Sequence, residues 1–179
     1  MSDIILHDKI SGGPLARDKI KVLVKSGHAE ERIVELEVGS RITAILDIVA
    51  VERGCAIDEL VLVREGEDEL LTEVILIEAD YPHHRRHHVH HTGDVNVTVF
   101  YQAEDGRRDF KRQATVEDVL TWAIKVFNID PSMAAEFELA RRGQTEQLPG
   151  SEHVGHLAGR HHELALDLVR GDIANGRHP

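Results

Sequence analysis

The sequence repeats one arrangement of secondary-structure signals, and this repeat constrains the fold more than any other feature. Residues 39–54 read GSRITAILDIVAVERG and residues 114–129 read ATVEDVLTWAIKVFNI, each with the apolar spacing of a helix that packs one face on a core. A similar turn segment follows each helix, VREGEDELL at 63–71 and ARRGQTEQL at 140–148. A unit that occurs twice in 179 residues predicts two similar small domains.

The first unit is predicted to contain two strands, a helix and two further strands. Apolar residues alternate with polar ones in two segments that a short turn separates, which is typical of a β-hairpin with one exposed face. Ser40 is a suitable N-cap for a helix that begins near Arg41 and ends before Gly54. The predicted strands are residues 19–25, 32–38, 60–64 and 74–77, and the helix lies between the second and the third.

The second unit follows the same β-β-α-β-β order. Its helix starts with the capping-box sequence Thr115-Val116-Glu117-Asp118, and Pro131 prevents the helix from continuing. Near the end of the chain, Leu164, Leu166 and Leu168 alternate with other residues, as in a half-buried strand. Four strands are predicted in this unit. The first begins at Val95, the second covers residues 107–113, the third contains Phe137 and Leu139, and the fourth, at 163–169, closes the unit.

Composition and charge exclude several classes of protein. The chain has 21 basic and 32 acidic residues and a formal charge of −11, which argues against general binding to nucleic acids or anionic membranes. It has no run of about 18 apolar residues, and its first residues lack the order of a signal peptide, so we expect a cytoplasmic protein. Its one cysteine, Cys55, excludes an intramolecular disulfide and a cysteine-based zinc cluster.

Residues 81–93, between the two units, are rich in histidine and arginine and poor in apolar side chains. We interpret this segment as a linker, either solvated or extended as a short stiff strand. Arg85 and Arg86, with histidines that gain charge below about pH 6.5, could instead form a basic patch for phosphate or an acidic partner. Because flexible polyhistidine binds metals without a defined geometry, we predict no native metal site. The candidate ligands, if the segment does bind metal, are His83, His84, His87, His88, His90 and His91.

The predicted units resemble the β-grasp plan of ubiquitin, in which a hairpin and a crossing helix precede a last strand that runs beside the first. The resemblance is clearest in the second unit, in VNVTVFYQ, in the TVEDVLTWAIKVF helix and in the closing strand that ends with Val-Arg-Gly. The predicted fold class is α+β, with two tandem ubiquitin-like β-grasp domains. The predicted parts are a flexible arm at 1–18, domains at 19–80 and 94–170, a linker at 81–93 and a conjugation tail at 171–179. This layout is similar to that of bacterial two-domain ubiquitin-like proteins of antiphage conjugation operons.

The resemblance implies a protein modifier. In such families an E1-like enzyme adenylates a C-terminal glycine, an E2-like enzyme carries it as a thioester to a target protein, and a JAB-type peptidase removes any residues beyond the glycine. Glycine suits this position because no Cβ crowds the reacting acyl group. The candidates are Gly176 and, as the alternative, Gly171. We favour Gly176, which lies about 27 Å beyond Leu168 in an extended chain, and we expect cleavage after it, before Arg177.

Other functions find less support in the sequence. Arg170, Arg141 and Arg142 are candidate residues for docking to an enzyme of the pathway. No Ser-His-Asp or Cys-His arrangement and no phosphate-binding loop is apparent, so we expect neither enzyme activity nor a cofactor. Two alternatives to the modifier are a non-conjugated scaffold that holds partners on its sheets, and a metal-binding protein that uses the His-rich segment. We expect neither nucleic acid nor a membrane among the partners.

Overall fold

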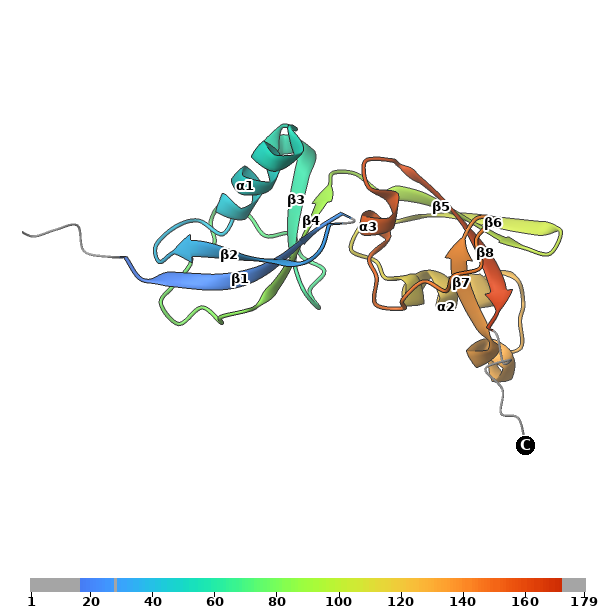
Figure 1. Cartoon of the computed structure of the whole chain (residues 1–179). Helices are drawn as coiled ribbons and strands as arrows, with labels where there is room; N and C mark the ends of the chain where they lie inside the picture. The colour runs from blue at the N-terminus through green and yellow to red at the C-terminus, as the bar shows by residue number, and fades with distance from the viewer. Residues whose placement is uncertain (1–16, 28, 172–179) are drawn as a thin grey trace, which may run out of the picture.

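Two four-stranded sheets, each covered by a helix, make up the described part of the chain (Figure 1). The computed structural model describes residues 17–27 and 29–171. The two sheets lie side by side along the molecule, and the described ends of the chain are at its opposite ends (Figure 1). The predicted α+β fold of two tandem β-grasp domains is confirmed.

The first domain has the strand order β2-β1-β4-β3, with β1 and β4 parallel at the centre and antiparallel strands at both edges. Helix α1 buries Ile45, Leu46 and Val49 against the sheet, and it ends at Gly54, whose φ of 61° is in the left-handed region that favours glycine. The elements are β1 (Lys19–Ser26), β2 (Arg32–Glu37), α1 (Ala44–Arg53), the 3₁₀ helix η1 (Ile57–Glu59), β3 (Leu60–Arg64) and β4 (Arg86–His91).

The second domain repeats this topology as β6-β5-β8-β7, again with its two central strands, β5 and β8, parallel. The capping box predicted for its helix is present, because Thr115 Oγ1 accepts from Asp118 N at 3.2 Å and Thr115 N donates to Asp118 Oδ2 at 2.8 Å. The elements are β5 (Val95–Tyr101), β6 (Glu104–Phe110), α2 (Val116–Val126), the 3₁₀ helix η2 (Pro131–Glu136), β7 (Phe137–Arg141), α3 (Val154–Ala158) and β8 (Glu163–Arg170).

The two copies agree at the turn segment that the sequence repeat indicates. Gly66 and Gly143 have φ of 78° and 76°, and the leucine that follows each turn donates its N–H back to the preceding strand. These two bonds are Leu71 N to Leu62 O and Leu148 N to Leu139 O, each 2.8 Å long. Each domain has its own apolar core, formed by the inward-facing residues of its sheet and helix.

The predicted linker at 81–93 is wrong, because residues 86–91 form β4 in the middle of the first sheet. The inward-facing residues of β4 are His87 and Val89, which occupy the positions of Leu166 and Leu168 in the second domain. The first domain therefore extends to His91 rather than to residue 80, and only residues 92–94 separate β4 from β5.

Two other expectations for the first unit are also wrong. Residues 74–77 do not form a strand; Val74 is 81% exposed, whereas Ile77 fills the core. This segment matches residues 151–154 of the second domain, since Leu76 and His153 make equivalent bridges to Arg41 and Thr115. Ser40 does not cap α1: its hydroxyl donates to Glu37 O at 2.6 Å, and the helix begins three residues later than predicted.

Candidate functional site

The end of β8 is the place where the chain leaves the second domain. The N–H of Gly171 donates to Glu136 O at 2.7 Å, so this glycine is held against the segment that precedes β7. A Cβ built on Gly171 would lie 3.3 Å from the carboxyl group of Glu138, which shows how closely the backbone approaches its neighbours. Gly171 is thus the last described residue of the chain, and Gly176 and Arg177 lie outside the described residues.

The three arginines proposed for docking differ in how they are held. Arg141 donates from Nη2 to Leu157 O at 3.0 Å, so it ties β7 to α3. Arg142 lies with its guanidinium carbon 3.8 Å from the centroid of the Phe100 ring and forms an ion pair with Asp167. Arg170 is exposed beside the exit of the tail, 5.6 Å from the Phe137 ring centroid. Docking through any of them stays a prediction.

Asp167 organises the outer face of the second sheet next to Arg142. Its Oδ2 accepts from Gly143 N at 2.8 Å. Burial raises the pKa of Asp167, but the bond from Gly143 and the contact with Arg142 lower it more, so the net pKa lies below the ordinary value. The carboxylate is therefore charged at neutral pH and fixes the β7 turn to β8.

The six histidines of the segment 81–91 do not act as one flexible group. His83 Nδ1 accepts from Lys21 N at 3.3 Å, and His84 is exposed with φ of 58°. His91 Nε2 lies 3.3 Å from Arg53 Nη1. Burial and then the charge of Arg53 lower the pKa of His91. These three side chains therefore point to separate places.

His87 belongs to the core of the first domain. Its Nδ1 lies 2.9 Å from Arg85 O and its Nε2 lies 2.7 Å from the Tyr81 hydroxyl, so the network assigns the ring proton to Nδ1. Arg64 Nε in turn donates to the same hydroxyl at 3.2 Å. Burial lowers the pKa of His87 to about 4, and the ring is neutral at pH 7.

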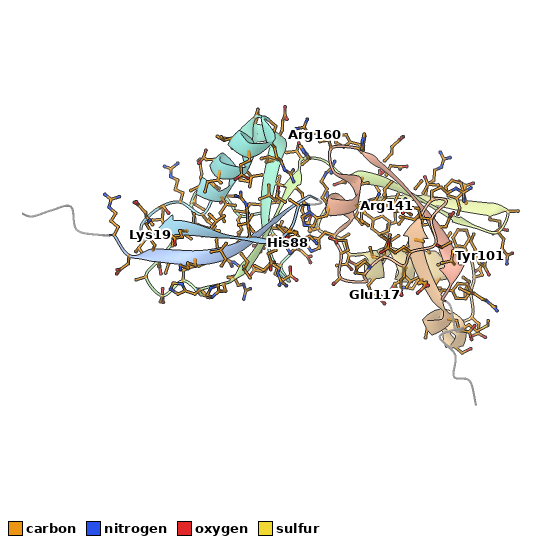
Figure 2. The ribbon with its side chains drawn as sticks, in the orientation of Figure 1. Lys19, His88, Tyr101, Glu117, Arg141 and Arg160 are labelled. Atoms are coloured by element: carbon orange, nitrogen blue, oxygen red, sulfur yellow. The ribbon has the colours of Figure 1, made fainter. Side chains whose placement is uncertain are left out.

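The remaining two, His88 and His90, meet two histidines that the sequence interpretation did not single out. His153 and His156 lie at the start of α3, in the second domain, and all four rings are buried. Figure 2 labels His88 where the first sheet faces the second domain. A signal for this pairing exists in the sequence: His-x-His on a strand and His-x-x-His on a helix each place two rings on one side of their element.

Comparison with known proteins gives one family match. Residues 96–171, less than half of the chain, match the family model of BilA ubiquitin-like domain 2. The comparison with curated proteins gives no match. No helix in the described ranges is long and apolar enough to cross a membrane.

Solved structures with similar folds include two single domains. The ubiquitin of Caldiarchaeum subterraneum is 15% identical, with 44% of this chain and 95% of that chain covered and a TM-score of 0.36. The N-terminal ubiquitin-like domain of the 4931431F19Rik protein is 19% identical, with 49% of this chain and 88% of that chain covered and a TM-score of 0.35. The family match covers the second domain, and the first domain repeats its strand order with parallel central strands, so the chain consists of two tandem domains of β-grasp topology, the second of which matches a ubiquitin-like family.

Proposed function

We propose that the chain is a protein modifier that is joined to target proteins through Gly176. The observation that carries the proposal is the end of β8, because this closing strand of the second domain leads directly through Gly171 into residues 172–179. An enzyme that adenylates a carboxyl group must admit the last residues of its substrate as an extended segment. Gly171 N donates to Glu136 O, and residues 172–179 follow this bonded position in the chain.

Gly176 suits this chemistry better than Gly171. The N–H of Gly171 is engaged and its α-carbon lies against Glu138, so an acyl group at this residue would lie on the surface of the domain. Five further residues span at most about 17 Å, enough to carry Gly176 into an enzyme pocket. Cleavage before Arg177 by a JAB-type peptidase would expose it.

Only the second domain can supply such a tail. The closing strand of the first domain, β4, continues through residues 92–94 into β5, so its end is internal to the protein. The proposed partners are an E1-like activating enzyme, an E2-like conjugating enzyme, a JAB-type peptidase and a target protein. The match of the second domain to BilA, a protein of bacterial antiphage operons, supports a role in antiphage defence.

Thioester formation on the cognate E1-like enzyme tests the proposal. Chains that end at Gly176, chains that end at Gly171 and the full chain are each incubated with the enzyme and ATP. Non-reducing electrophoresis then detects a thioester that dithiothreitol removes. We expect the chain that ends at Gly176 to form the thioester directly. We expect the full chain to form it only after peptidase treatment.

A matched variant, Gly176→Val in the chain that ends at this position, controls for the glycine itself. The Cβ and methyl groups of valine crowd the acyl adenylate, so the thioester should be lost while the fold is unchanged. Activation of the chain that ends at Gly171 alone would shift the site to that residue. Absence of a thioester with every truncation would refute the modifier function and leave a non-conjugated scaffold.

A further inference from the structure

Strand β4 presents two histidines on the outer face of the first sheet. Side chains alternate along a strand, and because His87 and Val89 face the core, His88 and His90 both face outward. These outward residues are nevertheless only 5% and 1% exposed. The second domain covers them, since α3 packs against β4 (Figure 1).

The covering segment also presents two histidines. His153 is the N-cap residue of α3 and His156 follows three positions later, so both rings project from the same side of this turn. They are 7% and 1% exposed. The only elements that bring all four rings together are therefore the closing strand of one domain and a short helix of the other.

The four imidazoles surround a common point. One nitrogen of each ring lies within 4.8 Å of one nitrogen of every other. Two contacts are shorter, His88 Nδ1 to His156 Nε2 and His90 Nε2 to His153 Nδ1, both 2.9 Å. Zinc–nitrogen bonds of about 2.0–2.1 Å in a tetrahedron place the nitrogens about 3.4 Å apart. The short pairs need to open by only about 0.5 Å to accept an ion.

Hydrogen bonds among the rings do not satisfy all their nitrogens. His90 Nδ1 is buried without a hydrogen-bond partner among the described residues. Four imidazoles buried in one place are costly unless their nitrogens are bound.

We propose that His88, His90, His153 and His156 form a tetrahedral zinc site that joins the two domains. Neutral imidazole suits Zn²⁺, and four protein ligands without an open position are typical of a structural site. The site does not depend on the proposed conjugation, because its ligands lie on β4 and at α3 and not at the end of β8.

Acidic side chains supply the surroundings that a divalent cation requires. The carboxylate of Glu65 contacts His88 Nε2, which leaves His88 Nδ1 to face the other rings, as in the carboxylate–histidine–metal arrangement of zinc proteins. A surface pocket beside His88 is lined by four glutamates and two basic residues, so an excess of negative charge lies next to the site; these residues are Glu30, Glu31, Glu65, Glu152, Lys25 and Arg86. Glu65 is thus a positioning residue.

Metal binding also has a specific consequence for Gly27. Gly27 N donates to His156 Nδ1 at 3.0 Å, which places the ring proton of His156 on Nε2. A metal ion on Nε2 moves that proton to Nδ1, where it opposes the N–H of Gly27. Zinc therefore breaks this bond, and the amide resonance of Gly27 reports whether His156 has become a ligand.

Calorimetry on the whole protein, stripped with a chelator and titrated with ZnCl₂ at pH 7.5, tests the site directly. We expect one tight site per chain, and we expect Co²⁺ in its place to give the absorption of a tetrahedral complex. A double variant, His90→Gln with His153→Gln, should weaken zinc binding at least about 100-fold, and Glu65→Gln should weaken it about 10- to 100-fold without changing the metal-free melting temperature.

The matched control is a double variant of exposed or edge histidines, His83→Gln with His84→Gln, which should bind zinc like the wild type. Equal losses in both double variants would show promiscuous binding and overturn the proposal. If the His90/His153 variant fails to fold, the stoichiometry, the Co²⁺ spectrum and the Gly27 amide of the wild type test the site. Weak or non-stoichiometric uptake, an octahedral Co²⁺ spectrum, or an unchanged Gly27 amide on zinc addition would each refute the four-histidine site.

Discussion

Replacement of Arg112 by methionine should destabilise the protein more than replacement of any exposed arginine. Arg112 is 2% exposed, and its guanidinium donates to three backbone carbonyl oxygens. These bonds are Nε to Gly93 O at 3.0 Å, Nη1 to Gly159 O at 2.8 Å and Nη2 to His161 O at 2.9 Å. One side chain thereby holds the connector between the domains and the loop before β8.

The expected cost follows from these three bonds. A hydrogen bond from a charged donor contributes about 1.5–3 kcal/mol, and methionine keeps most of the apolar stem but none of the donors. Gly93 and His161 are at the surface, where water can replace part of the loss, so we take the lower end of the range. The free energy of unfolding should fall by about 3–5 kcal/mol. Arg112→Lys should recover about a third, since one ammonium group cannot reach three carbonyls in a plane.

Urea denaturation, followed by the fluorescence of the single tryptophan, Trp122 in α2, measures this change. The matched control is Arg107→Met, since the side chain of Arg107 is 70% exposed and its contact with Asp105 is 3.4 Å long. We expect an effect within about 0.5 kcal/mol there. If Arg112→Met stays within about 1 kcal/mol of the wild type, the assignment of Arg112 as the clamp of the connector is refuted.

Three further predictions concern single contacts. Gly155→Ala should lower the free energy of unfolding in urea by about 1–3 kcal/mol, because its Cβ would lie 2.6 Å from His90 Nδ1 and 2.9 Å from Arg112 O. The control is Gly150→Ala, whose Cβ would lie 3.3 Å from the end of the flexible Glu117 side chain. Equal effects of the two substitutions would contradict the packing argument. Tyr81→Phe should lower stability by about 1–2 kcal/mol in thermal denaturation, since it removes the hydroxyl between Arg64 and His87; an unchanged melting temperature would count against that network. Asp167→Asn should lower the free energy of unfolding by about 1 kcal/mol at pH 7. Because the pKa of Asp167 is lowered in the folded protein, this difference in stability from the wild type should vanish as the pH falls from about 4 through the folded pKa. A difference in stability that persists at lower pH would exclude a charge effect.

The fold was predictable from the sequence where apolar periodicity and turn chemistry agree. Gly66 and Gly143 mark the same turn in both copies, and the alternating leucines of 163–169 give the closing strand of the second domain. The helix cap at Thr115 follows from its sequence alone. In these segments the local signal and the tertiary structure favour the same state.

The closing strand of the first domain was not predictable in the same way. Residues 86–91 contain four histidines and one valine, so they lack the apolar alternation that identifies a buried strand. The strand forms because β1 and β3 hydrogen-bond to it on both sides, and His87 is buried through its bonds to Tyr81 and Arg85. The apolar run at 74–77 competes for the same assignment, although Val74 and Leu76 are exposed and only Ile77 of this run is fully buried.

The histidine cluster could be predicted only in part, for a related reason. His88 and His90 were recognisable as candidate ligands, but their partners lie 63 and 68 residues away in the chain. Only the docking of α3 on β4 brings them together, and that docking depends on the packing of both domains. Gly176 lies outside the described residues, so the choice of Gly176 over Gly171 as the site of conjugation stays a prediction.

The three residues between β4 and β5 form a short connector that is held in place by hydrogen bonds and an ion pair. Thr92 N donates to Glu59 O at 2.9 Å, Gly93 O accepts from Arg112, and Asp94 pairs with Lys111 at 3.0 Å, so each connector residue is bonded to one domain or the other. The two domains therefore do not move independently about this connector. In a conjugate of the proposed type, the target would carry a stiff projection in which the first domain stands at a fixed distance and angle from the second.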